Sequence, residues 1–468
     1  MTPRVCLRVW TVLWLLVSGV FTHGTVSAQP ADQNAPAAAK PPQGANPGLQ
    51  NNVVAAPPAE GSRFDLWVGH AVSDNLARLA TKARGSYNSL GALFDMNRAM
   101  SRIDLALNGT LERRFYSTSL FDNEAVGSLE GLARFTVARD RFWWSFQDDF
   151  GQGRVDTLRA SSPENRQPVN VISTGPELDL PLGRRTKLAI GSRYSVRSYG
   201  TSKELEGDAT TSEIGLIRQV REGTTVSLVA QQSETNYDGG QPSYHIDTAR
   251  LRYRKTLTSG AILAEGGKNE IVYSDFMSDG PLWQLVWTRN LSSRSRLDLS
   301  TSREFTDSGG LFGLTTGQIA VTRPTEIILA PNPLEQRRAG IAYTLTLSRT
   351  VATLLVRSFH EEYVKDSTLD NNGAAAVFQF RYKLNSRMSL AMDYTGEQRD
   401  FVTRDASEYN RYLSISLEQR LPGHMGLEYH ATRNHRTGFD PYEETVYEIR
   451  LVFSPERVRA RVKAPQKP

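Results

Sequence analysis

The sequence predicts an all-β protein: a transmembrane up-and-down antiparallel β-barrel of about 20 strands (18–20). Three observations favour this fold. Strand-like runs alternate apolar and polar residues from Arg63 to about Ser454, with no helical segment between them. Short turn signals alternate with longer loops at an interval of about 37 residues, which fits two tilted strands, one tight turn and one loop. Many polar positions carry arginine or acid, as expected of a lumen that is wet or lined by charge.

The N-terminus has the pattern of a secretory signal peptide, residues 1–28. Arg4 and Arg8 precede an apolar run, Val9–Phe21, and Val26–Ala28 supplies small residues for cleavage. The alternative is an uncleaved membrane anchor. The only cysteine, Cys6, precedes the apolar run, so it is not placed for lipidation. Because no cysteine follows residue 28, the sequence excludes disulfides and thiolate metal sites there.

Charge and hydropathy narrow the class of protein further. The formal net charge is +5, and two of these charges belong to Arg4 and Arg8. This balance is too mild for a nucleic-acid partner, and export argues against one as well. No apolar run of roughly 18 residues follows the signal peptide, so no spanning helix is expected. A negative mean hydropathy fits a soluble protein but also a transmembrane barrel, since half of each strand faces water.

Composition divides the rest of the chain into three parts. Residues 29–62 are rich in Pro, Ala, Gln and Asn, which predicts a disordered periplasmic linker. Residues 63–454 form the predicted outer-membrane barrel, and residues 455–468 a basic periplasmic tail. An even number of strands places both termini at the same end of the barrel, so we expect both in the periplasm together with the short turns.

The turn signals alternate in length along the chain. The short ones are Asn97–Ser101, Ala138–Arg141, Leu182–Arg185, Arg221–Gly223, Thr258–Gly260, Ser292–Arg294, Ser348–Thr350, Asn385–Arg387 and Pro422–His424. The longer loops are Thr157–Gln167, Gly200–Asp208, Tyr237–Ser243, Thr306–Leu334, Lys365–Asn372 and Thr403–Glu408. Thr306–Leu334 is the longest, and the sequence leaves open whether it folds into the barrel as a constriction or packs outside as an extracellular loop.

Successive side chains of each predicted strand point to opposite faces, so apolar and polar residues alternate along it with a period of two. Leu251 and Tyr253 oppose Arg250, Arg252 and Arg254, for example, whereas stretches such as Val351–Phe359 are mixed. A soluble β-sandwich alternates as well and is the alternative, but it has fewer strands than the sequence indicates. Phe453 ends the last strand and resembles the terminal aromatic signal that the barrel-assembly machinery reads, which makes that machinery and outer-membrane lipid expected partners.

The stretch RFWWSFQDDFGQGR, residues 141–154, follows a short turn. One face of the predicted strand presents Phe142, Trp144 and Phe146, which suits the aromatic girdle of a barrel, and Trp143 would point into the lumen or pack under the turn. Alternation also sends Asp148 toward lipid. Either a β-bulge near Gly151 shifts the phase, or the strand has left the hydrocarbon by that point.

This stretch, SPENR (Ser162–Arg166) and STGPELDLPLG (Ser173–Gly183) together resemble a known family of outer-membrane barrels. That family accompanies exosortase (PEP-CTERM) and exopolysaccharide gene clusters. The matching positions are Trp144, Asp148, Pro163, Asn165, Arg166, Thr174, Gly175 and Pro176, with Ser73–Asn75 after the first strand. The resemblance implies an outer-membrane location and a role in polysaccharide export or anchoring, with polysaccharide or export-system proteins as partners. It supplies no catalytic residues. By themselves, Asn165, Gly175 and Pro176 indicate loop and turn chemistry.

The candidate lumen-lining residues are arginines. They are Arg193, Arg197, Arg250, Arg252, Arg254 and Arg381. The ladder Arg250, Arg252 and Arg254 could bind an anionic sugar or favour anions in a pore. The alternative is pairing with lumen acids, for example Asp104, Glu130, Asp298, Asp393, Glu397 or Glu418.

Three functions follow: a porin-like channel or export barrel, a closed structural barrel, and an outer-membrane hydrolase. The third would need histidines such as His430 and His435, with Asp440 nearby, but their spacing is unspecific. We therefore predict no enzyme, no catalytic residues, no metal and no cofactor.

Overall fold

The computed structural model describes residues 61–119, 121–156, 158–307 and 329–455. The chain divides into two compact units, residues 1–45 and 46–468, and every described residue lies in the second. The predicted signal peptide, nearly all of the linker and most of the basic tail therefore lie outside the described residues. No helix among the described residues is long and apolar enough to cross a membrane.

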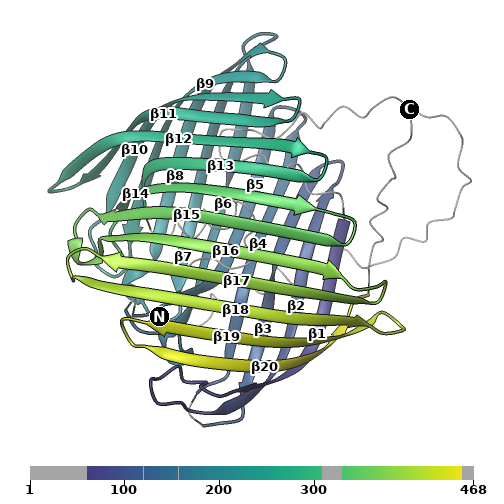
Figure 1. Cartoon of the computed structure of the whole chain (residues 1–468). Helices are drawn as coiled ribbons and strands as arrows, with labels where there is room; N and C mark the ends of the chain where they lie inside the picture. The colour runs from purple at the N-terminus through teal and green to yellow at the C-terminus, as the bar shows by residue number, and fades with distance from the viewer. Residues whose placement is uncertain (1–60, 120, 157, 308–328, 456–468) are drawn as a thin grey trace, which may run out of the picture. The chain divides into compact units, whose positions relative to one another are not determined.

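Twenty β-strands make up the described chain (Figure 1). Their bounds are β1 Gly61–Ser73, β2 Gly85–Ala99, β3 Ile103–Tyr116, β4 Glu124–Ala138, β5 Phe142–Arg154, β6 Arg166–Pro181, β7 Thr186–Tyr199, β8 Gly207–Arg221, β9 Thr224–Tyr237, β10 Tyr244–Leu257, β11 Gly260–Tyr273, β12 Met277–Ser292, β13 Ser295–Thr306, β14 Leu334–Thr346, β15 Thr350–Tyr363, β16 Asn371–Lys383, β17 Met388–Phe401, β18 Ala406–Arg420, β19 Met425–Thr437 and β20 Tyr442–Phe453. Three single 3-10 turns lie in loops: η1 Pro163–Asn165, η2 Lys203–Leu205 and η3 Ser367–Leu369.

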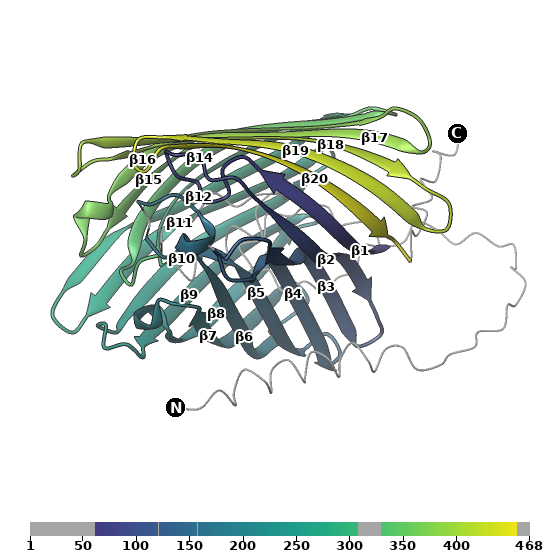
Figure 2. The same ribbon diagram turned by 90° about the horizontal axis from the view of Figure 1, so that it is seen from below.

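The strands form one closed antiparallel ring. Each strand pairs with its neighbours in sequence, and β1 pairs with β20 from Leu66 opposite Phe453 to Ser73 opposite Val446. Figure 2 shows β1 and β20 side by side where the ring closes. Closure leaves no unpaired strand edge, so every strand finds partners on both sides. The predicted fold class and strand number are confirmed.

Short turns join the strands at one end of the ring, and connections that are mostly longer join them at the other; the exceptions are residues 274–276, 402–405 and 438–441, which are as short as the turns. Nine short turns join β2 to β3, β4 to β5 and so on to β18 and β19, and all nine predicted turn signals fall at them. Ten connections occupy the other end, which we call the loop end. Four of these were not recognised in the sequence, at residues 74–84, 117–123, 274–276 and 438–441. Gly61 and Phe453 both lie at the turn end.

Alternation separates an apolar outer surface from a polar lumen. Val68 and Leu90 pair across β1 and β2 with 53% exposure each, and Leu251 on β10 is 55% exposed. Their neighbours in sequence face inward, as Arg250 and Arg252 do with 6% and 3% exposure. A continuous belt of large exposed apolar side chains requires a non-aqueous surrounding, which a bilayer supplies.

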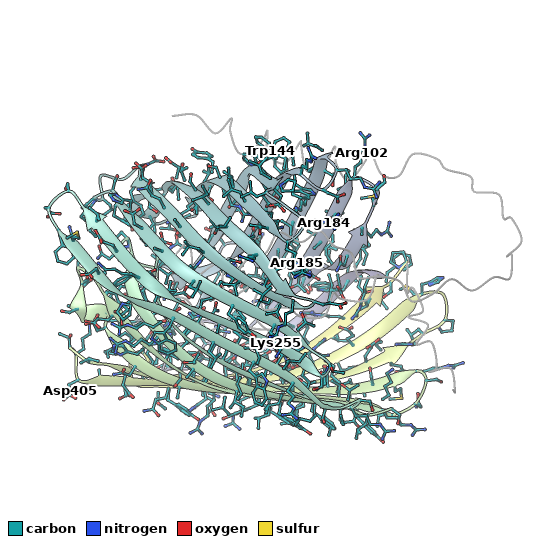
Figure 3. The ribbon with its side chains drawn as sticks, turned by 90° about the horizontal axis from the view of Figure 1, so that it is seen from above. Arg102, Trp144, Arg184, Arg185, Lys255 and Asp405 are labelled. Atoms are coloured by element: carbon teal, nitrogen blue, oxygen red, sulfur yellow. The ribbon has the colours of Figure 1, made fainter. Side chains whose placement is uncertain are left out.

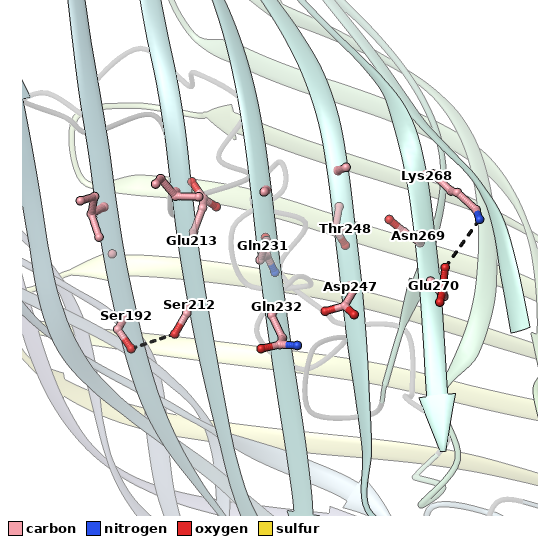
Figure 4. A pocket seen from close by; sticks show the side chains of 15 residues that line it. Ser192, Ser212, Glu213, Gln231, Gln232, Asp247, Thr248, Lys268, Asn269 and Glu270 are labelled. Atoms are coloured by element: carbon pink, nitrogen blue, oxygen red, sulfur yellow. Dashed lines mark hydrogen bonds and ion pairs between the residues drawn. The ribbon is translucent and has the colours of Figure 1, made fainter. Parts of the chain in front are cut away.

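A hollow on β7 to β11 marks where this belt ends (Figure 4). On the turn side of the hollow the outward residues are apolar, such as Ile214 and Ala249. On its loop side they are polar: Ser192 and Ser212 lie 3.2 Å apart, and Lys268 lies 2.9 Å from Asp279. The outer surface therefore changes from apolar to polar toward the loop end.

Candidate functional site: the barrel lumen

The arginine ladder on β10 lies inside the lumen and is paired. Arg250 contacts Glu213 of β8 at 3.2 Å and Glu265 of β11 at 3.6 Å, and it donates to Gln231 at 3.1 Å. Arg252 stands directly opposite Glu265 and donates to its carboxylate. Arg254, nearer the turn end, is partly exposed. Two buried acids thus pair with Arg250 and Arg252, two of the three arginines of the ladder, which favours a structural role for this pair over an open anion site.

The pairing partners differ from the acids that the sequence suggested. Glu213 and Glu265 were not among them, and most of those acids have arginines of their own. Asp298 binds Arg296 at 2.8 Å, and Glu397 lies 3.3 Å from Arg399. Register sets the partner of Arg252, which stands opposite Glu265, whereas the long side chain of Arg250 reaches past β9 to Glu213 on β8.

The other predicted lumen arginines also face inward. Arg193 donates to Gln147 at 2.9 Å, and Arg381 lies 4.0 Å from Asp393 with 57% of its side chain exposed. Arg197 is buried and binds Asp307 at 2.8 Å. The structure does not bring these three together, since they contact different carboxylates or amides on different strands.

Asp307 begins the longest connection and turns into the lumen. Its Oδ2 accepts hydrogen bonds from Tyr244 at 2.5 Å and from Arg197 at 2.8 Å. At the far end of the connection, Pro331 accepts a hydrogen bond from Tyr237 at 2.8 Å, and Leu329 packs on Val169 and its neighbours. Both described ends of Thr306–Leu334 therefore contact the inner wall of the barrel. Residues 308–328 lie outside the described residues.

The β5–β6 loop, residues 155–165 with 157 outside the described residues, reaches the far side of the barrel mouth. Arg436 of β19 donates to the carbonyl of Leu158 at 2.6 Å and to that of Arg159 at 3.1 Å. The same guanidinium binds Glu408 of β18 at 2.8 Å, and Arg154 of β5 approaches Glu408 at 3.8 Å. We call Arg154, Glu408 and Arg436 the mouth cluster. The side chains of Glu408 and Arg436 are each 1% exposed.

Further contacts fasten this loop along its length. The backbone N–H of Ala160 donates to Asp440 at 3.0 Å, and Arg78 donates to the carbonyl of Ser161 at 2.5 Å. The side chain of Leu158 packs on the buried cluster of Ala330, Leu334, Tyr363 and Phe401. Arginine-to-carbonyl bonds carry most of the attachment, and such bonds are directional. The loop therefore lies over part of the lumen at the loop end, between β5 and the strands β18 and β19.

Exposure of the inward residues changes along the barrel. Near the loop end the mouth cluster and Asp307 are buried. Near the turn end Asp104 and Arg381 face inward and are exposed. Among the described residues, the inward side chains named here are therefore buried near the loop end and solvent-exposed near the turn end.

The β1–β2 loop is fixed to the barrel rim by Asp74. Burial alone would raise the pKa of Asp74, but hydrogen bonds from Lys82 and from the Thr445 backbone N–H hold that pKa below its usual value. The Lys82 bond is 2.5 Å and the Thr445 bond is 2.7 Å long. The ionised carboxylate is thus the form that holds this loop in place.

Asn165 and Arg166 organise the β5–β6 loop. The Asn165 amide donates to the carbonyls of Asp156 at 2.8 Å and Ala160 at 3.0 Å and accepts from the Asp156 N–H at 2.7 Å. Arg166, the first residue of β6, binds Glu124 at 2.7 Å. For Asn165, the loop chemistry indicated by the sequence agrees with these contacts.

Gly175 and Pro176 do not form a turn; they lie inside β6. A Cβ at Gly175 would come within 1.8 Å of the Ser192 carbonyl, so glycine is needed there for the close approach of β7 rather than for a turn. The β6–β7 pairing skips Gly175 and Pro176 while its register continues unchanged on both sides. Pro176, which has no N–H to donate, fits at this gap in the β6–β7 pairing. The prediction that Gly175 and Pro176 form a turn was wrong.

Trp144 and Asp148 share the outward face of β5. Trp144 is 37% exposed and donates to Thr174 at 2.8 Å. Trp143 faces the lumen under Arg134, whose guanidinium carbon lies 4.3 Å from the ring centre. The β5–β6 register is continuous through Gly151, so no bulge shifts the phase there, and Asp148 stays on the face that alternation assigns to it.

The histidines are not arranged for hydrolysis. His430 faces the lumen, 3.1 Å from Glu428, whereas His435 lies an odd number of residues away and faces outward. The carboxylate of Asp440 accepts a hydrogen bond from the backbone N–H of Ala160. Among the described residues, no group of three or more His, Cys, Asp or Glu side chains could hold a metal ion.

The mouth cluster was not identified from the sequence. Arg154, Glu408 and Arg436 are far apart in the chain, and each resembles any charge at a strand end. The one available signal was that Arg154 and Glu408 lie near predicted loops; the loop beside Arg436 was not predicted.

Comparison with known proteins gives one family match. Residues 333–433 match the family described as a membrane-bound beta barrel domain (DUF5777). No curated protein matches the chain. The match supports a membrane-bound β-barrel, in agreement with the apolar outer belt.

Several solved outer-membrane structures are weakly similar. The ferric enterobactin receptor PfeA of Pseudomonas aeruginosa, in complex with enterobactin, has 8% identity and a TM-score of 0.45, with 84% of this chain and 81% of that chain covered. The siderophore receptor PirA of the same organism has 10% identity and a TM-score of 0.40, covering 85% and 81%. OccAB3 of Acinetobacter baumannii has 9% identity and a TM-score of 0.35, covering 84% and 99%. At this level the likeness says nothing about function.

Proposed function

We propose that this chain is an outer-membrane barrel of a Gram-negative bacterium that conducts a hydrophilic substrate from the periplasm. The observation that carries the proposal is the difference in burial along the lumen, whose inward residues are exposed at the turn end and buried beside the β5–β6 loop at the loop end. The signal-peptide pattern and the position of both barrel ends at the turn end support a periplasmic turn end. The substrate class is a polysaccharide, as the resemblance to exosortase-associated barrels implies.

The number of strands supports a conducting channel. Side chains fill the interior of barrels of about 8 strands, whereas barrels of 16–18 strands leave an aqueous channel and those of 22 hold a plug. A 20-stranded ring is too wide for side chains alone, so its interior must hold water, an inserted segment or a substrate. The β5–β6 loop is a short segment held mainly by polar bonds, and such a closure can be released without unfolding the wall.

A closed structural barrel that anchors other export components is the second candidate. The paired ladder favours it, because Arg250 and Arg252 are neutralised by Glu213 and Glu265 and leave no free anion path at that level. In this case export-system proteins would contact the barrel from the periplasm, and the covered mouth would be its permanent state.

Planar-bilayer conductance of the refolded chain separates the two candidates. The unmodified barrel should insert with few or no current steps, and replacing residues 156–164 with a short Gly-Ser linker should give regular steps. An anionic polysaccharide added on the turn side should block those steps more strongly than neutral dextran. A loop-replaced barrel that inserts and stays silent would favour the structural role, and equal block by both polymers would exclude a charged polymer as the substrate.

A further inference from the structure

Exposed cations surround the turn end of the barrel. In the nine short turns and the three residues on either side of each, the exposed cations that do not stand on inward strand positions are Arg98, Arg102, Arg139, Arg141, Arg184, Arg185, Arg221, Lys255, Arg294, Arg349 and Arg387. Exposed acids in the same stretches, the inward Asp104 aside, are Asp140 and Glu222. Eight of the nine short turns contribute at least one of these cations, so the charge forms a ring rather than a patch on one side.

Figure 3 shows Arg102, Arg184, Arg185 and Lys255 at one end of the strands and Asp405 at the other. The loop end differs in charge. Its exposed acids, among the described loop residues, are Asp122, Asp156, Glu164, Glu204, Asp238, Asp275 and Asp405, and its exposed cations are Lys82, Arg84, Arg159, Lys203, Lys365 and Arg404. Exposed acids and exposed cations are thus mixed at the loop end, whereas cations dominate the turn end.

Exposed aliphatic side chains accompany the cations. Eight of the nine short turns carry one within the same stretch: Met100, Val137, Leu182, Val220, Leu291, Leu347, Leu384 and Leu421. Val137 and Leu182 are each 61% exposed. Large apolar groups at the tips of polar turns are unfavourable in water, but they suit the boundary between acyl chains and headgroups, where cations can contact phosphates.

We propose that this ring of turns is a binding surface for anionic phospholipid headgroups in the leaflet that surrounds the turn end. A protein partner would contact one arc of the barrel, whereas lipid surrounds all of it, as these cations do. A polymer passing through the lumen would meet only the inward cations, of which Arg250 and Arg252 are paired with buried acids. The inference needs only a membrane-embedded barrel, so it stands whether or not the barrel conducts.

Quenching of tryptophan fluorescence by brominated lipid measures this preference. Trp144 faces outward three residues from the β4–β5 turn, and its strand pairs with β6, which leads to Arg184 and Arg185. The refolded full mature chain, with the two other outward tryptophans, Trp283 and Trp287, replaced by phenylalanine, is placed in phosphatidylcholine vesicles that contain brominated phosphatidylglycerol or brominated phosphatidylcholine. A cation at an anionic surface favours the anionic lipid by roughly fivefold at low salt. We expect a preference of that order, and it should weaken in 0.5 M salt because the turns are exposed.

Two matched variants show which end of the barrel is responsible for the preference for anionic lipid. Replacing Arg184, Arg185 and Arg221 with glutamine should bring the ratio of phosphatidylglycerol to phosphatidylcholine binding close to one. Replacing the loop-end residues Lys82, Lys203 and Arg404 with glutamine changes the same number of charges and should leave the ratio as it was. Heat-modified gel mobility shows that each variant is folded. A native barrel without the preference, or an equal loss in both variants, overturns the inference.

Discussion

Replacing Arg436 with methionine should release the β5–β6 loop from the far side of the mouth. The guanidinium donates to the carbonyls of Leu158 and Arg159, and both bonds end on this loop. Methionine keeps much of the buried volume but donates nothing. A hydrogen bond from a charged group contributes roughly 1.5–3 kcal/mol, so the closed state should lose about 3–6 kcal/mol. At 1.4 kcal/mol per factor of ten, the equilibrium for loop opening should rise roughly 10²- to 10⁴-fold.

Amide hydrogen exchange of the refolded barrel measures this opening directly. The amides of Val155 and Asn165, which donate to backbone carbonyls of the same loop, should exchange faster by that factor, while strand amides keep their rates. Arg433→Met is the matched control, because Arg433 lies on the same strand but faces outward in an exposed pair with Glu443. Unchanged loop exchange in Arg436→Met, or equal acceleration of all strands, would refute the reasoning.

Three other predictions test the wall and the rim. Gly175→Ala should lower the free energy of unfolding in urea by roughly 1–3 kcal/mol or more, because the added Cβ collides with the Ser192 carbonyl. Gly183→Ala is the control and should change that free energy little, because the space around Gly183 is open. Equal losses of unfolding free energy in the two variants would contradict the close approach of β7 to Gly175. Arg252→Met should cost about 3–5 kcal/mol by leaving Glu265 buried and under-paired, and Arg252→Met with Glu265→Gln should recover most of that loss; no recovery would mean that the pair is not the cause. The lowered pKa of Asp74 means that the β1–β2 loop gains stability above the ordinary pKa of 3.8 and loses it as pH falls through the lower folded value. The protection factor of this loop, which corrects its exchange rate for the intrinsic pH dependence, should therefore fall as pH drops below 3.8. Asp74→Asn should remove that dependence, and a variant that retains it would exclude Asp74 as the group.

The wall of the barrel could be predicted because it repeats. Period-two alternation assigns Leu251 outward and Arg252 inward without any knowledge of their partners, and a tight turn between two such runs fixes an antiparallel pair. These two local signals are enough for the strand number and the closed topology. Nothing more distant in the chain is needed, since each strand pairs with the next.

Contacts that depend on geometry between strands were not predictable. Gly175 resembles a turn residue, and only the backbone of β7 at van der Waals distance explains it. The partners of the ladder follow from a register that places Glu265 opposite Arg252. The mouth cluster joins β5 to β18 and β19 across the lumen, and no pattern along the chain records which charges meet there.

Cysteine accessibility tests the central claim, a lumen that is open at the turn end and covered at the loop end. Because no cysteine follows residue 28, single cysteines at Arg381, Thr235 and Arg404 report separately on the lumen near the turn end, the lumen near the loop end and the outer loop surface. A membrane-impermeant thiol reagent on the turn side should label position 381, and on the loop side it should label position 404 alone. Labelling of position 235 or 381 from the loop side would contradict a covered mouth.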